Sequence, residues 1–263
     1  MRLQAIAAAV AILCASPLYE QDLPDWVLQL SRVKRKAKAE LQRLPDFACA
    51  ETINRFERRP RTDIYRPIDT VRLDVAFVGG KEMVAPAGGT GSFQEMDLKR
   101  MAYGGAMGTG AFSAVARNLF VNDNGRTTAM VEDRILDRPA LRFSFVVPVN
   151  QAGYTISSAT AVGSVGLEGT FWADAENHNL LRIEERAVDI PLELDIADTT
   201  TVVTYAMTKI GPSEVLLPRS ARTILTNTNG WQGRNEIEFT NCREYVAESV
   251  IRFDTDAPPP KKK

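Results

Sequence analysis

The feature that most constrains the fold is a series of segments in which apolar and polar residues alternate. One such run spans residues 70–77, and Gly79 and Gly80 follow it before a second apolar pair at Met83 and Ala85. Alternation that ends in Gly-Gly indicates a β-hairpin, because both turn positions accept a positive φ. Similar segments recur at 127–134, 140–147, 154–158, 165–172, 180–188, 201–210, 220–226, 235–240 and 249–253. Polar turn clusters separate many of them, so the sequence predicts one large antiparallel meander.

A long amphipathic helix is predicted ahead of this meander, at residues 22–44. Its apolar residues recur at three- and four-residue steps and form one stripe: Leu23, Trp26, Val27, Leu30, Val33, Ala37, Leu41 and Leu44. Asp22 is the expected N-cap, and Pro45 helps to end the helix. The opposite face is rich in Lys and Arg. We expect that face to be solvated, with contact to anionic lipid as the alternative.

Residues 93–121 interrupt the meander. A short helix is predicted from Phe93 to Met101, and a glycine-rich link at 104–110 joins it to a second amphipathic helix at 112–120. The expected fold is therefore mainly β. It is a curved antiparallel sheet or half-barrel, with an N-terminal helix and a two-helix insertion on its concave face.

The N-terminal segment has the pattern of a secretory signal. Arg2 precedes a short apolar run that ends in small residues, and we predict removal of residues 1–18. A lipoprotein signal with Cys14 as the lipidated residue is the alternative, but Leu13 stands where such signals carry a small residue. We expect a periplasmic or secreted location and no transmembrane segment in the mature chain. Residues 22–254 are expected to form one domain, followed by a disordered tail at 255–263.

Two cysteines remain once this segment is removed. Cys49 and Cys242 lie near opposite ends of the domain. An even number of cysteines in an oxidising compartment favours a disulfide between them, and two unrelated buried thiols are the alternative. A bridge requires Cα atoms within about 7 Å of each other, so the first and last strands would have to be neighbours.

Composition and motifs argue against several classes of function. The net charge of −1 is unlike that of a nucleic-acid binder. The single histidine, His178, lies in a polar turn beside Asp174 and Glu176, where we expect turn formation and not catalysis. The glycines at 104–110 lack the Lys-Ser/Thr ending of a phosphate-binding loop. We therefore predict no enzyme activity, no metal and no cofactor.

Large apolar residues share one face of several predicted strands: Leu73, Val75, Phe77, Leu141, Phe143, Phe145, Val203, Tyr205 and Met207. If the helices fill the concave side only partly, these residues line a cavity for an acyl chain. If the helices fill it completely, the same residues form the core.

The order of elements and several motifs resemble the LolA/LolB-type periplasmic lipoprotein carriers and their wider superfamily. The stretch Gly169-Thr-Phe-Trp-Ala-Asp174 is followed by Leu180-Leu-Arg-Ile-Glu184, a strand that contains Tyr205, and Leu217-Pro218. The chain also resembles uncharacterised secreted bacterial proteins that open with Leu-Pro-Asp-Phe/Tyr-x-Cys and close with Cys-Arg-x-Tyr. Here these motifs are residues 44–49 and 242–245.

The resemblance implies a carrier that binds an apolar or acylated ligand, a lipid or a lipoprotein. The expected ligand-binding residues are Leu73, Val75, Phe77, Phe112, Leu119, Phe143, Phe145 and Tyr205. The ligand would lie between the concave sheet and the 93–121 insertion, with the glycine link as a hinge; alternatively, these glycines only form turns. The competing function is an envelope protein–protein interaction module with a filled core.

Overall fold

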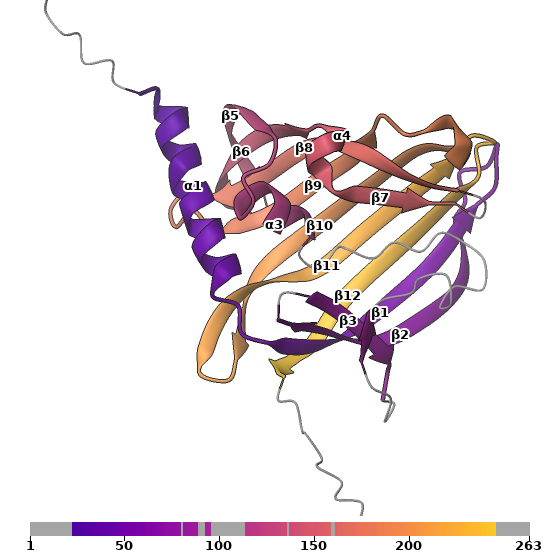
Figure 1. Ribbon diagram of the computed structural model, residues 1–263, viewed down its shortest axis with the longest axis horizontal. Coiled ribbons are helices and arrows are strands. Elements are labelled where there is room, and N and C mark those ends of the chain that lie inside the picture. Colours follow the sequence, from indigo (N-terminus) through magenta and orange to yellow (C-terminus); the bar gives the residue numbers. More distant parts are fainter. Residues whose placement is uncertain are drawn as a thin grey trace, which may run out of the picture.

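The computed structural model describes residues 23–79, 81–88, 93–95, 114–135, 137–158 and 161–245. Its strands form one antiparallel 12-stranded sheet in the order β4-β3-β2-β1-β12-β11-β10-β9-β8-β6-β5, and β7 pairs with β8. The strands are β1 (Phe47–Arg58), β2 (Arg66–Val78), β3 (Lys81–Pro86), β4 (Gln94–Glu95), β5 (Arg126–Ile135), β6 (Arg138–Val147), β7 (Tyr154–Ser157), β8 (Val162–Asp174), β9 (Leu180–Val188), β10 (Ile196–Ile210), β11 (Ser213–Asn227) and β12 (Gln232–Glu244). The helices lie beside the curved sheet (Figure 1). The mainly β, antiparallel fold predicted from the sequence is confirmed.

The first and last long strands are neighbours. β1 pairs with both β2 and β12, and the pairing of β1 with β12 shifts register between Ala48 and Ala50. Cys49 and Cys242 lie at this irregularity with their Cα atoms 4.1 Å apart, and they form a disulfide. The predicted bridge is therefore present.

Helix α1 (Asp25–Gln42) occupies most of the predicted N-terminal helix. Val33, Ala37 and Leu41 of the predicted stripe are buried. The expected N-cap is wrong, because the helix begins at Asp25 and Pro24 takes the N-cap position without a side-chain cap. The stripe is also buried only in its second half, since Leu23 is 60% exposed.

The basic face of α1 takes part in ion pairs. Lys34 lies 2.6 Å from the Oδ1 atom of Asp123, at the turn before β5. Lys36 and Arg43 both pair with Glu40, which is buried. These cations are held mainly by acids of the same molecule. None of the helices in the described part of the chain is long and apolar enough to cross a membrane.

The insertion differs in part from its prediction. Its second helix is present as α3 (Ala114–Phe120), and Leu119 and Phe120 are buried in the core. The predicted first helix is wrong at Gln94–Glu95, which pair with Met83 and Val84 as strand β4. Phe112 and the glycine link at 104–110 lie outside the described residues, as do residues 1–18, the predicted strand at 249–253 and the tail. Two short elements were not predicted, α4 (Val149–Ala152) and the 3-10 turn η1 (Leu192–Leu194).

Alternation along the strands divides the sheet into an inner face and an outer face. On the inner face, α1 and α3 cover the main core, to which β1, β2, β6, β8 and β10 contribute buried side chains. A second apolar cluster joins β7 and η1 to the sheet and consists of Ile156, Val165, Ala187, Leu194 and Ile196. The outer face carries the alternate residues, many of them charged or hydroxylated.

Candidate functional site

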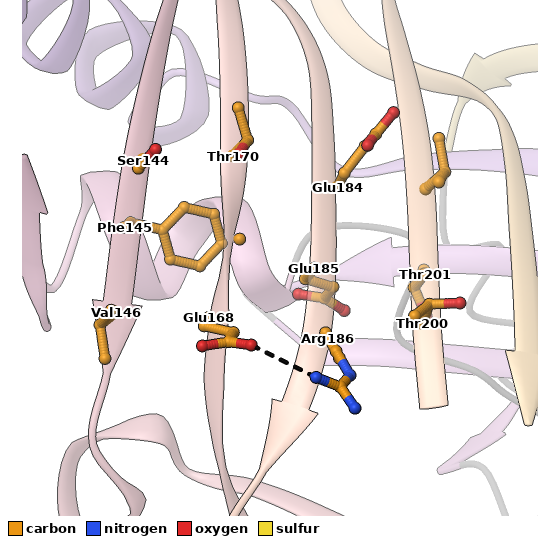
Figure 2. Close-up of a pocket in the computed structure, with 12 residues that line it drawn as sticks. Ser144, Phe145, Val146, Glu168, Thr170, Glu184, Glu185, Arg186, Thr200 and Thr201 are labelled. Carbon is orange, nitrogen blue, oxygen red and sulfur yellow. Dashed lines mark ion pairs between the residues drawn. The ribbon is translucent and has the colours of Figure 1, made fainter. Parts of the chain in front are cut away.

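An open groove of about 590 Å³ crosses the outer face over β6, β8, β9 and β10 (Figure 2). We call it the outer groove. Strand pairing arranges its walls as two cross-strand rows. One row is Ser144, Thr170, Glu184 and Val202, and the other is Val146, Glu168, Arg186 and Thr200. The residues between the two rows form the floor of the groove: Phe145, Gly169, Glu185 and Thr201. By the alternation of their strands, these four positions are on the inner face.

The absence of a side chain at Gly169 shapes this part of the sheet. A Cβ atom at that position would lie 2.1 Å from the carbonyl oxygen of Glu184 and 2.8 Å from the Cζ atom of Phe145. Backbone and ring therefore approach β8 more closely than any side chain permits. Glycine within a strand often marks such a close approach, with a local bend of the sheet.

The outer groove has the charge pattern of an ordinary solvated sheet surface. Arg186 lies 3.6 Å from Glu168 and donates a hydrogen bond to Asp198. Its guanidinium is thus shared between two acids of the same face. These pairs leave no concentration of like charge that would identify a ligand.

A row of polar side chains crosses the inner face, beginning behind the outer groove at Glu185 and Thr201 and continuing beyond it. Six adjacent strands, β9 to β12 and then β1 and β2, each contribute one polar residue. The strand register places each of these residues opposite the polar residue of the next strand. We call this line the inner polar row, and it consists of Glu185, Thr201, Thr223, Asn235, Arg55 and Asp69. Thr201 and Thr223 have their hydroxyl oxygens 3.3 Å apart. The row is unusual because a sheet face that meets a core is normally apolar.

One end of the inner polar row is an ion pair. Arg55 is only 2% exposed, and it donates through Nε to the Oδ1 atom of Asp69 at 2.6 Å and through Nη2 to Oδ2. Asp69 is 43% exposed. This two-point hydrogen bonding raises the pKa of Arg55 and lowers the pKa of Asp69. The buried cation is therefore compensated.

The other end of the row is a carboxyl group that has no counter-ion among the described residues. Glu185 is 7% exposed, and its Oε2 atom has no hydrogen-bond partner within the described part of the chain. Burial raises the pKa of Glu185 to about 8. Tyr154 of β7 and Tyr205 of β10 lie near Glu185. Burial raises the pKa of both hydroxyls, and the electrostatic effect of Glu185 raises it further. We call these three residues the acid–tyrosine cluster, and at neutral pH all three are uncharged.

A second buried acid pair lies elsewhere on the sheet. Burial, and then the neighbouring Glu82, raise the pKa of Glu51 to about 8. Burial raises the pKa of Glu82 to about 7. Among the described residues, no group of three or more His, Cys, Asp or Glu side chains is placed to hold a metal ion.

The predicted ligand-binding residues are gathered in the main core. Seven of them are buried there: Leu73, Val75, Phe77, Leu119, Phe143, Phe145 and Tyr205. Phe143 stacks on Phe171 with ring centroids 5.1 Å apart, and Phe120 meets the same ring edge-on at 5.1 Å. These side chains therefore pack against one another. One of the seven, Tyr205, also belongs to the acid–tyrosine cluster, and the role of the set in ligand binding stays a prediction.

Glu185 and Tyr154 were not identified from the sequence, although a signal for Glu185 exists. Ile183 and Ala187 of β9 are buried on the inner face. Glu185 stands between them in the same period-two register, so it is an acid at an apolar position. The same signal marks Glu51 and Arg55 in β1.

His178 and Asp174 have the structural surroundings expected of turn residues. His178 has a φ of 61°, and its Nε2 atom lies 3.0 Å from the Oε1 atom of Gln29 on α1. Asp174 accepts hydrogen bonds from the backbone N–H groups of Glu176 and Asn177. Asp174 thus forms the turn, as predicted.

We expect Glu185→Gln to flatten the pH dependence of stability between pH 5 and pH 8. The folded carboxyl stays protonated up to about pH 8, whereas the ordinary pKa is 4.5. The unfolded state therefore binds fewer protons than the folded state in this interval. The stabilisation that this group contributes is fully present below about pH 4.5 and falls as pH rises, by at most about 1.4 kcal/mol per pH unit. Urea unfolding at pH 5, 6, 7 and 8 measures the slope.

Glu184→Gln, on the outer face of the same strand, is the control for this experiment. In every variant, Glu51 and Glu82 still make stability fall as pH rises, because burial raises the pKa of both. An unchanged slope in Glu185→Gln would contradict the assignment of a buried, protonated acid at this position.

Comparison with known proteins finds no matching family model and no matching curated protein. Solved structures do match. A LolA superfamily protein from Nitrosomonas europaea is 11% identical, with a TM-score of 0.38 over 82% of this chain and 94% of that one. A DUF1329 family protein from Desulfovibrio piger is 13% identical, with a TM-score of 0.42 over 85% of this chain and 94% of that one. Both TM-scores are below 0.5, so these likenesses carry no argument about this chain.

Proposed function

We propose that this chain is a periplasmic or secreted protein that binds or carries an apolar or acylated ligand, a lipid or the acyl chains of a lipoprotein. The role is one of binding and not of catalysis. The observation that carries the proposal is the Oε2 atom of Glu185, which is buried on the inner face and has no hydrogen-bond partner among the described residues. Two tyrosines, Tyr154 and Tyr205, lie near this acid.

The energetics of Glu185 favour a ligand over a purely structural role. A buried polar atom without a partner costs about 1–3 kcal/mol, and an apolar side chain at the same position would avoid that cost. Phe145 of β6 lies opposite Gly169 of β8, and its ring provides an apolar wall for the Glu185 position. A ligand with an apolar chain and one polar group would bury its chain against such surroundings and satisfy the carboxyl.

The disulfide supports the proposed location. Disulfides persist in oxidising compartments and are rare in the cytosol. Cys49 is buried in the core and is bridged to Cys242. This agrees with export directed by the predicted signal at residues 1–18.

A protein–protein interaction module in the cell envelope is the second candidate. It is favoured by the close packing of the seven predicted ligand-binding residues in the main core. A core packed in this way leaves no room for a ligand, and the partner of such a module would be another envelope protein.

Native mass spectrometry of protein purified from an envelope fraction separates the two candidates. We expect a bound lipid mass that is lost on denaturation and that is reduced in Glu185→Leu. Glu184→Leu changes the neighbouring outer-face residue and should keep the bound mass. The absence of a lipid mass, together with no binding of a fluorescent acyl probe, would favour the filled-core module.

A further inference from the structure

We propose that Glu185 selects the polar group of the ligand. Its carboxyl donates a hydrogen bond to the carbonyl oxygen of an acyl ester or amide, so the site prefers these neutral groups to free carboxylates and to amines. This inference rests on the proposed function, because it concerns the same inner-face site.

The first step is that, among the described residues, no cation pairs with the Glu185 carboxyl. The neighbouring Arg186 lies on the outer face, where it contacts Glu168 and Asp198. Arg182, on the same strand and the same outer face, pairs with Glu184. Arg55 is four strands away along the inner polar row, a distance of about 19 Å at the usual strand spacing.

The second step is that the groups facing Glu185 in the described part of the chain are neutral. Thr201 lies opposite it on β10, and Gly169 lies opposite it on β8. Tyr154 and Tyr205 are the titratable groups on which it acts, and both hydroxyls stay protonated at neutral pH because burial raises their pKa. The cluster therefore offers hydrogen bonds without charge.

The third step is the chemistry of a protonated carboxyl. A neutral carboxylic acid has one O–H donor, whereas a carboxylate only accepts. A carbonyl oxygen of an ester or amide accepts that O–H without bringing a charge into the core. A free fatty-acid anion would bury a charge that no cation among the described residues compensates. An ammonium group would bury its own charge beside a neutral acid or, if Glu185 gave up its proton, would require the desolvation of two charges.

A set of ligands with one acyl chain length tests the preference. Monododecanoylglycerol, N-dodecanoylethanolamine, dodecanoate and dodecylamine would compete with a fluorescent acyl probe for the full chain at pH 7. We expect the ester and the amide to displace the probe at concentrations about tenfold lower than the acid and the amine do, which corresponds to one hydrogen bond.

Variants at position 185 assign the preference to the carboxyl. Glu185→Gln should keep the preference for the ester and the amide, because the amide N–H of Gln also donates a hydrogen bond. Glu185→Leu should abolish this preference. Glu184→Gln on the outer face should change nothing. Affinity of the unmodified protein for the ester should fall between pH 7 and pH 9 as the donor ionises, and affinity of Glu185→Gln should stay constant. Circular dichroism confirms that each variant is folded.

The outcomes separate the two proposals. A preference for the amine that Glu185→Gln abolishes, or an ester preference that survives in Glu185→Leu, would overturn the inference and leave the proposed function standing. If the unmodified protein binds none of the four ligands and carries no lipid, both are overturned.

Discussion

Loss of the Cys49–Cys242 disulfide should lower the free energy of unfolding by about 4 kcal/mol, the order expected from the entropy of closing so long a loop. The two cysteines are 193 residues apart in the sequence. The bridge restricts the unfolded chain over most of its length. It also holds β1 beside β12, a pairing of strands that are far apart in the sequence. Urea unfolding of the oxidised and the reduced protein measures the difference without any substitution.

The Cys49→Ala/Cys242→Ala variant is the matched comparison. It should unfold at the same urea concentration as the reduced protein, apart from a small effect of the lost sulfur atoms in the core. Each single substitution should cost nearly as much as both together, because either one removes the bridge. An unfolding midpoint that reduction leaves unchanged would show that the bridge does not stabilise the fold.

Gly169→Val should destabilise the protein by about 3 kcal/mol, at the upper end of the usual cost of overpacking. Its Cβ would meet the carbonyl oxygen of Glu184 at 2.1 Å and the ring of Phe145 at 2.8 Å. The oxygen belongs to the backbone of β9 and cannot turn away, so β8 and β9 would have to separate. Thermal or urea unfolding, followed by circular dichroism, measures the loss.

Two further variants identify the cause. Gly166→Ala lies on the same strand, and there the nearest atom to an added Cβ is the Val188 methyl carbon at 3.0 Å, so its cost should be smaller than that of Gly169→Ala. Combining Phe145→Leu with Gly169→Ala should recover only part of the loss, because it relieves the contact with the ring and leaves the one with Glu184. Equal costs for the two glycines would contradict this account.

Sequence patterns predicted the strands well wherever apolar residues alternate without interruption. β5, β6, β8 and β9 agree with the predicted segments to within about three residues, as expected for strand ends. β1 was missed because Glu51 and Arg55 occupy inner-face positions and break its apolar alternation. The helix expected from Phe93 was wrong at Gln94–Glu95, where pairing with β3 overrides the local pattern.

The candidate site depends more on tertiary structure than the fold does. The β architecture, the long N-terminal helix and the pair of cysteines can be predicted from the sequence alone, because alternation, helical periodicity and cysteine number are local or compositional properties. The pairing of Arg55 with Asp69, and the lack of a counter-ion for Glu185 among the described residues, depend on the three-dimensional arrangement of the strands. The physical reason is register: it places residues of distant strands opposite one another, and the arginines nearest to Glu185 in the sequence project from the other face of the sheet.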